Sequence, residues 1–404
     1  MIKNTILLIF TLIFFSISAT SSYTQDGHEG HNHSGHAKSD KKFYIHGGIK
    51  MHFDTIAEAH EKNEEVDESY THSHIEMGYN LNKNFSLLTD IKIEGESGGH
   101  SHGEATVSKL PEDKFFDDHK LFIDKLILSY STDVGITLYG GKFAPSVGLD
   151  YHAFPGIWGY QKIEEYAIVE RLGYGIALKQ NFEDLGTHKL NVSTFFKDNT
   201  SLSNSVITDR GKTKKSDGGV SNTQDFSSYA ISIEGKDFFS LSNNFVDGLS
   251  YKVGHAKQSK AVKNLGSNSA NSSAINDNVN LTHDEKRSSI SLVHKSIIAP
   301  NLSMRILTEF MKIEHFTGEE SHDRDYITTG LDFYYKKINV GGTYTQETNE
   351  AAEADEAIDD KVYQVSLGYL VNNNLHLHIG YKKADEANEI KHTVGAMIAY
   401  YFDM

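Results

Sequence analysis

The chain has 404 residues and a formal net charge of -16, with 33 Gly, 22 Phe, 21 Tyr, 4 Pro and 0 Cys. Without cysteine, a disulfide framework, a thiol nucleophile and a thiolate metal site are all excluded. The acidic balance argues against a nucleic-acid partner, because phosphates are bound by Lys and Arg. Few prolines and many aromatic residues favour a chain built mostly of paired strands, since proline cannot donate a ladder hydrogen bond.

The N-terminal residues have the pattern of a secretory signal peptide. A positive start at Lys3 precedes an apolar run from Ile6 to Phe15, and small residues follow at 16–19. This pattern predicts a cleaved signal peptide over 1–22 and therefore export. No later run reaches the roughly eighteen apolar residues that a membrane-spanning helix needs. If the exported chain enters a membrane, we expect it to do so with strands.

The dominant pattern after the signal peptide is alternation. The run from Tyr363 to Tyr369 has a large apolar residue at every second position, and the run from Leu375 to Lys382 repeats this after an Asn-rich turn. A period of two puts apolar side chains on one strand face and polar ones on the other. The predicted strands are 43–53, 70–81, 85–95, 119–131, 134–143, 170–182, 187–197, 226–236, 245–257, 285–297, 301–315, 325–335, 338–348, 361–371, 374–385 and 390–402.

The connections between these strands have a regular rhythm. Short turns such as 82–84 and 132–133 follow the even-numbered strands, and long polar loops such as 96–118 and 144–169 follow most odd-numbered ones. The strands average about eleven residues, the length that a tilted membrane strand requires. We therefore predict an all-β fold, a transmembrane antiparallel β-barrel of about sixteen strands over 43–404, with short periplasmic turns and long external loops. A secreted soluble sandwich or propeller, the alternative, would lack this rhythm.

The last and the fourth predicted strands differ from the others in their pattern. The last strand has apolar side chains on one face from Val394 to Phe402, which is similar to the C-terminal strand of outer-membrane proteins, although Met404 stands last. Strand 119–131 fits the alternation worst, because Phe122 and Ile123 would lie on opposite faces. We expect either a slip of register in this strand or a position beneath a folded loop.

Three short motifs resemble the region around the third external loop of Gram-negative outer-membrane porins, the sixteen-stranded general and phosphate-type families, and are similar to porin-like proteins of alphaproteobacteria. The motifs are Gly-Lys-Phe-Ala-Pro-Ser-Val-Gly at 141–148, Phe-Pro-Gly-Ile-Trp-Gly at 154–159 and Glu-Arg-Leu-Gly-Tyr-Gly at 170–175. The resemblance implies passive diffusion of small hydrophilic solutes or ions through a water-filled pore, surrounding outer-membrane lipid and a homotrimer. A dense arginine ladder is not evident, so we do not predict phosphate specificity.

The resemblance further implies that loop 144–169 folds into the barrel and constricts it. Loop carboxylates would then face basic residues of the wall. The loop candidates are Asp150, Glu164 and Glu165, and the wall candidates, which strand parity points into the lumen, are Lys50, Lys92, Lys142, Lys179, Arg305 and Lys382. Charges are expected inside, because Lys or Arg facing lipid at mid-bilayer costs about 2–4 kcal/mol. The alternative is that these charges only solvate the lumen. Acidic external loops would favour cations, whereas the wall carries more Lys and Arg than Asp and Glu, so we expect no strong ion selectivity.

Histidines are concentrated in the first part of the chain. Imidazole is a common ligand for zinc, nickel and copper, so these clusters are candidate sites for weak Zn or Ni binding. The candidates are His28, His31, His33 and His36 in a flexible segment over 23–42, and His72, His74, His100 and His102 near the expected external mouth. The first group would be periplasmic and the second external, so they cannot form one site. The alternative function is a plugless, substrate-specific channel or receptor for metal ions or chelates; the bland alternative is a solubilising tail.

Motifs of the common enzyme classes are missing from the sequence. There is no Gly-x-Ser-x-Gly, His-Glu-x-x-His, phosphate-binding loop or dinucleotide-binding fingerprint. We therefore predict neither an enzyme nor a resident cofactor, with an adhesin and an outer-membrane enzyme as the remaining alternatives.

Overall fold

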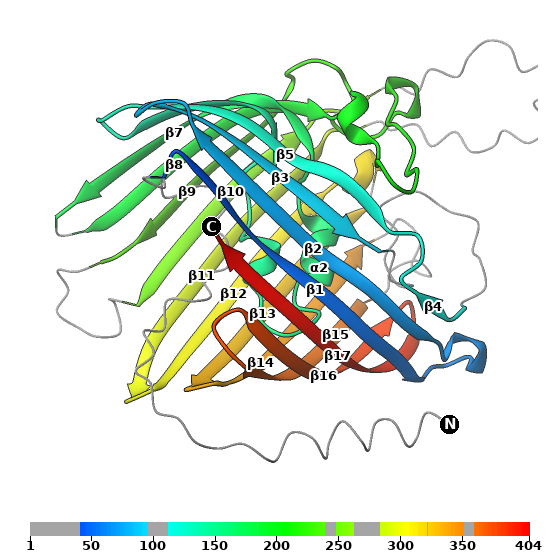
Figure 1. Ribbon diagram of the computed structural model, residues 1–404. Helices are drawn as coiled ribbons and strands as arrows, with labels where there is room; N and C mark the ends of the chain where they lie inside the picture. The colour runs from blue at the N-terminus through cyan, green and yellow to red at the C-terminus, as the bar shows by residue number, and fades with distance from the viewer. Residues whose placement is uncertain are drawn as a thin grey trace, which may run out of the picture.

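The computed structural model describes residues 41–95, 112–183, 185–238, 248–261, 283–320, 322–350 and 359–404. Within these residues, sixteen strands form a closed antiparallel barrel, in which β1 pairs with both β2 and β17 (Figure 1). They are β1 (Phe43–Glu58), β2 (Asp67–Asn80), β3 (Phe85–Glu94), β5 (Lys120–Ser131), β6 (Ile136–Phe143), β7 (Arg171–Phe182), β8 (Gly186–Lys197), β9 (Ser228–Lys236), β10 (Leu249–Gln258), β11 (Glu285–Ala299), β12 (Leu302–Glu314), β13 (Asp323–Tyr335), β14 (Ile338–Glu350), β15 (Asp359–Leu370), β16 (Leu375–Glu386) and β17 (Glu389–Asp403).

The barrel confirms the predicted fold class and strand number. A seventeenth strand of two residues, β4 (Lys114–Phe115), pairs in parallel with β2 and was not predicted. Short helical turns lie in the connections. They are η1 (Lys62–Glu64), η2 (Tyr151–Ala153), α2 (Gln161–Tyr166), η3 (Ser201–Ser203), η4 (Lys215–Asp217) and η6 (Phe316–Gly318). Among the described residues, no helix is both long enough and apolar enough to cross a membrane.

Several strands extend farther than the alternation predicted. β1 continues to Glu58 rather than residue 53, and β2 begins at Asp67, with Thr55 opposite Asp67 in the register. Backbone pairing needs no apolar side chain, so a ladder continues past the point where the apolar pattern ends. The predicted loop 54–69 is correspondingly shorter in the structure.

The irregular fourth strand is explained by a β-bulge. Asp90 pairs with Lys125 while the next residue, Ile91, pairs with Ile123, so Asp124 is an extra residue in β5. An extra residue reverses the side-chain parity on its two sides. Phe122 accordingly points inward with 2% exposed, whereas Leu128 on the far side of the bulge is 49% exposed on the outer surface. The expected slip of register is therefore confirmed.

The two faces of the wall differ as a membrane barrel requires. In β15, the outward Val365 and Leu367 are 49% and 47% exposed, while the inward Gln364 and Ser366 are 8% and 2% exposed. The same division recurs in β11, where Ile290 faces outward. An apolar outer band with a polar interior is the arrangement of outer-membrane barrels.

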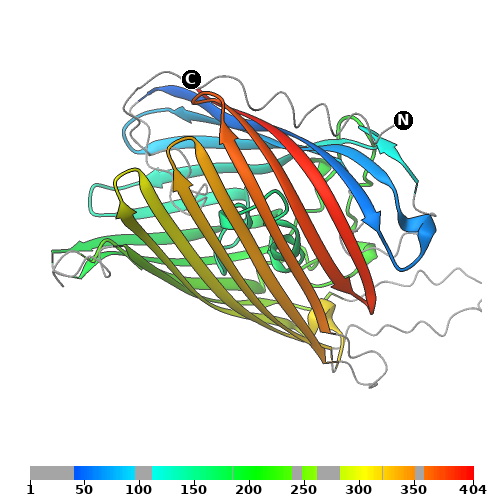
Figure 2. The ribbon, with the colours of Figure 1, turned by 90° about the horizontal axis from the view of Figure 1, so that it is seen from below.

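The connection between β6 and β7 turns back into the barrel. Its elements η2 and α2 lie in the interior of the barrel in both ribbon views (Figures 1 and 2). We call residues 144–170 the inner loop. The short turns gather at one end of the barrel with the C-terminus, and β4 and η1 lie at the other end (Figure 2). Any candidate site for solute passage therefore lies between the inner loop and the wall.

Candidate functional site

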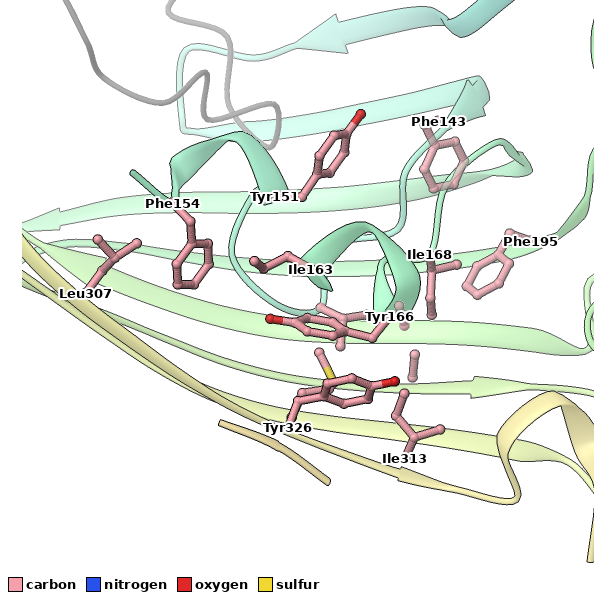
Figure 3. Close-up of a cluster of buried hydrophobic side chains, with 14 residues drawn as sticks. Phe143, Tyr151, Phe154, Ile163, Tyr166, Ile168, Phe195, Leu307, Ile313 and Tyr326 are labelled. Carbon is pink, nitrogen blue, oxygen red and sulfur yellow. The ribbon is translucent and has the colours of Figure 1, made fainter. Parts of the chain in front are cut away.

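One side of the inner loop packs on an apolar part of the wall. Figure 3 shows the side chain of Tyr166 in α2 lying over Tyr326 of β13, and their ring centroids are 4.8 Å apart. The loop residues of this cluster are Val147, Tyr151, Phe154, Ile163, Tyr166 and Ile168, and the wall residues are Phe143, Phe195, Ala230, Ala256, Leu307, Met311, Ile313 and Tyr326. Burial of this apolar area is the main force that holds the loop inside, at about 25 cal/mol per Å².

A buried carboxylate of β12 fastens the same side of the loop. Glu309 accepts hydrogen bonds from the Tyr166 hydroxyl at 3.0 Å, from the Leu149 backbone N–H at 2.5 Å and from the Ser291 hydroxyl at 2.6 Å. Two of these three donors belong to the loop. Hydrogen bonds require specific partners at short distance, so Glu309 adds direction to the apolar contact.

The opposite side of the loop is held mainly by polar contacts. Trp158, the single Trp of the chain, donates from Nε1 to Asp54 Oδ2 at 2.7 Å, and its backbone N–H donates to Gln364 Oε1 at 3.0 Å. The Tyr70 hydroxyl donates to the same oxygen of Asp54 at 2.9 Å. A small apolar contact of Trp158 with Met397 supports this anchor.

Lys162 of α2 is surrounded by carboxylates. Its Nζ lies 2.8 Å from Glu386, 3.1 Å from Glu165, 3.3 Å from Asp360 and 3.4 Å from Glu347. Burial opposes the charge of this ammonium, but the carboxylates of Glu165, Glu386 and Glu347 outweigh it and raise the pKa of Lys162 above its ordinary value. Lys162 therefore links α2 to β14, β15 and β16 as a cation.

The three acidic loop candidates occupy different positions. Glu164 lies 4.0 Å from the Nζ of Lys92, and Glu165 lies beside Lys162 of its own helix. Asp150 begins η2, where its side chain accepts a hydrogen bond from the His152 backbone N–H at 2.8 Å. The carboxylates of Glu164 and Glu165 therefore lie within ion-pair distance of lysines, rather than facing cations across a gap.

Three of the six basic wall candidates reach the part of the inner loop that contains η2 and α2. Lys382 donates to Gln161 Oε1 at 2.9 Å, and its Nζ lies 5.4 Å above the ring of Trp158. Lys92 is also 3.6 Å from Asp124 and contacts the Tyr151 hydroxyl. Lys50 interacts electrostatically with Asp150.

The other three basic candidates lie away from η2 and α2. Lys142, at the end of β6, contacts Glu170 at 2.6 Å and Asp198 at 3.0 Å. Arg305 is near the start of β12 and pairs with Asp332 at 2.5 Å. Lys179 is exposed near the end of β7 that leads into a short turn. Strand parity alone carries no information on depth along the barrel, which is why it grouped these residues together.

The histidine candidates divide between described and undescribed parts of the chain. The signal peptide, most of the 23–42 segment and His28, His31, His33, His36, His100 and His102 lie outside the described residues. His72 and His74 lie inside β2 and are buried beside the inner loop, not at the external mouth where we expected them. Because β2 starts at Asp67, both side chains lie deeper than the predicted strand implied. In the described residues, no three His, Cys, Asp or Glu side chains converge on one metal position.

Sequence reasoning missed several residues that position the loop. Lys162, Trp158 and His152 all lie in loop 144–169, where only acidic residues were singled out. The Lys-x-x-Glu spacing at 162–165 predicts a pair on one helix face and could have pointed to Lys162. Nothing in the sequence pairs Trp158 with Asp54, because the two are 104 positions apart.

Comparison with protein-family models gives no match, and comparison with curated proteins gives none. Three solved structures share the fold. OmpF of Salmonella typhi, in complex with daunomycin, has a TM-score of 0.51 at 11% identity, covering 89% of this chain and 97% of that chain. OprB of Pseudomonas putida has a TM-score of 0.51 at 8% identity, covering 89% and 93%. The outer-membrane channel DcaP of Acinetobacter baumannii has a TM-score of 0.50 at 9% identity, covering 89% and 97%. The chain therefore has a porin-type barrel fold.

Proposed function

We propose that this protein is an outer-membrane porin through which small hydrophilic solutes and ions diffuse passively. The observation that carries this proposal is the combination of an apolar outer band, a polar interior and an inner loop docked across that interior. An apolar outer surface suits lipid, and a polar interior suits water and solutes. The fold shared with OmpF, OprB and DcaP supports the same class.

The charges around the inner loop favour weak ion selectivity. Glu164 and Glu165 have Lys92 and Lys162 as immediate neighbours, so their fields are partly offset at short range. Loop carboxylates without such partners would attract cations strongly. A specific metal channel would line its path with metal ligands, whereas the inner loop presents pairs of carboxylates and lysines. We therefore favour the general porin over the metal-specific channel.

Single-channel recording of the mature protein in planar bilayers tests the proposal. We expect stable unit steps that scale with salt concentration, a small reversal potential in a salt gradient, and no saturation by a particular solute. Swelling of liposomes in small sugars supplies a second readout for uncharged solutes. If a correctly folded barrel, identified by its heat-dependent migration in gels, gives no steps and no swelling, the proposal fails. Cross-linking of the same sample tests the homotrimer that the family resemblance implies.

A further inference from the structure

Two histidines from different parts of the chain face each other where the inner loop meets the wall. His72 projects from β2 and His152 from η2 of the loop, and their Nε2 atoms are 3.2 Å apart. The rings are tilted by 56°, with centroids 5.5 Å apart. Each ring is also held by an aromatic neighbour, Tyr160 at 4.1 Å from His72 and Tyr151 at 4.1 Å from His152. The facing nitrogens are therefore fixed by packing on both sides.

The second nitrogen of each ring is turned toward a carboxylate. His152 Nδ1 is 3.3 Å from Asp150 Oδ1, and His72 Nδ1 is 3.8 Å from Glu94 Oε2. A neutral imidazole carries one proton, and a neighbouring carboxylate favours its placement on Nδ1. The two Nε2 atoms would then both present lone pairs to each other, which is repulsive unless a proton or a cation lies between them.

The geometry of the pair matches that of a metal-binding pair of imidazoles. Two imidazole nitrogens bound to one tetrahedral Zn²⁺ at about 2.0–2.1 Å are separated by about 3.3 Å. A ligating histidine commonly has a carboxylate next to its other ring nitrogen, and Asp150 and Glu94 lie within ion-pair distance of these nitrogens here. Two lysines, Lys50 and Lys92, also lie near the pair. The charge of Lys50 is offset in part by Asp150, and that of Lys92 by Asp124 and Glu164, at 3.6 and 4.0 Å.

We propose that His72 and His152 together bind one transition-metal ion, such as Zn²⁺ or Ni²⁺, which ties the inner loop to β2. This ion is held and not transported, so the inference goes beyond the proposed porin function. His74, on the same face of β2 with its ring 5.5 Å from His152, is near enough to supply a third ligand after a side-chain rotation. Water would complete the coordination.

Metal binding by the full mature chain in detergent tests this inference without requiring a pore. The six histidines outside the described residues could also bind metal, so the background protein replaces them with asparagine. The replacements are His28→Asn, His31→Asn, His33→Asn, His36→Asn, His100→Asn and His102→Asn. In this background, titration with Co²⁺ or calorimetry with Zn²⁺ should show one ion per chain.

The ligand substitutions should then have distinct effects. His72→Ala and His152→Ala should each weaken binding by at least about tenfold, and the double variant should be little worse than either single one, because the chelate is already lost. His255→Ala, on the outward face of β10 beside Ser288, is the matched control and should leave binding unchanged. Each variant is accepted only if its heat-dependent gel migration matches that of the background protein.

A cysteine pair tests the same geometry independently of histidine chemistry. Because the chain has 0 Cys, the His72→Cys and His152→Cys double variant carries only these two thiols. We expect it to bind one Cd²⁺ with the ultraviolet absorption of a thiolate complex, and the two single variants to bind far more weakly. The inference is overturned if the background protein binds no ion, if both alanine variants bind as the background does, or if the cysteine pair binds Cd²⁺ no better than single thiols. The first of these results would assign the 3.2 Å contact to a shared proton.

Discussion

The two sides of the inner loop contact the barrel wall by different physical means. On the β12–β13 side, Tyr166 packs against Tyr326 in an apolar cluster with one buried acceptor, Glu309. On the β1–β16 side, Trp158 and Lys382 make hydrogen bonds that need exact partners. Apolar contact tolerates small shifts, whereas a hydrogen bond is lost with them. The comparison indicates that the first side fixes the loop in the barrel and the second sets its orientation there.

The apolar side should give the largest effect on stability. Tyr166→Ala removes a buried ring and should lower the free energy of unfolding by about 3–5 kcal/mol. We expect the loop to detach from β12 and β13 and unit conductance to rise and become noisy. Urea unfolding in detergent and single-channel recording measure both effects. Tyr166→Phe, which keeps the ring and loses the bond to Glu309, should cost about 1–3 kcal/mol. If Tyr166→Phe lowered the free energy of unfolding as much as Tyr166→Ala, the hydrogen bond and not apolar packing would be the main contribution of this side chain.

The polar side should respond more modestly. Trp158→Phe removes the donor to Asp54 and should cost about 1.5–3 kcal/mol, as expected for a hydrogen bond to a charged group. Because the apolar side remains intact, we expect the loop to stay inside and the conductance steps to stay uniform. Limited proteolysis of the loop distinguishes this from detachment. If the inner loop of Trp158→Phe were cleaved as fast as that of Tyr166→Ala, both sides would contribute equally to holding the loop in the barrel.

Lys162 should affect ion preference more than stability. Lys162→Met leaves Asp360 and Glu386 without their shared cation, whereas the buried Glu347 keeps Arg324 at 2.9 Å. We expect a cost of about 1 kcal/mol, because Asp360 and Glu386 are partly exposed. The raised pKa of Lys162 keeps its charge present as the pH rises through the ordinary lysine range, so the wild-type preference should be constant from neutral to alkaline pH. The variant should shift the reversal potential toward cations. An unchanged potential would remove Lys162 from the conduction path.

The smallest effects should separate the basic wall residues by depth. Lys382→Gln removes a charge that contacts the loop, whereas Lys179→Gln removes an exposed charge away from it. Exposed charges are screened within about 8 Å at physiological salt, so Lys179→Gln should change the permeability ratio less than Lys382→Gln. Reversal potentials at low and physiological salt compare the two. A larger effect of Lys179→Gln would place the constriction elsewhere.

Sequence reasoning identified the barrel because alternation is a local property of each strand. Two consecutive residues, such as Gln364 and Val365, are enough to indicate which strand face meets lipid and which faces the interior. The site was harder to predict, because depth and partnership depend on contacts distant along the chain. The carboxylates beside Lys142 come from Glu170 and Asp198, and the partner of His72 is 80 positions away. The bulge at Asp124 interrupts the apolar–polar alternation of its strand, and this interruption indicates an irregularity but not its cause.

The closure of the barrel between its first and last strands sets the order in which the molecule can fold. β1 finds its second neighbour only when β17 is in place, so until the whole chain is present both edges remain unpaired and open to aggregation. The inner loop depends on late strands in the same way, since Trp158 and Gln161 bond residues of β15 and β16 that are 206 and 221 positions downstream. Long-range contacts of this kind form slowly. We therefore expect the inner loop to dock late in folding. An incomplete chain would have a barrel interior without the docked loop, and its edge strands would be unpaired.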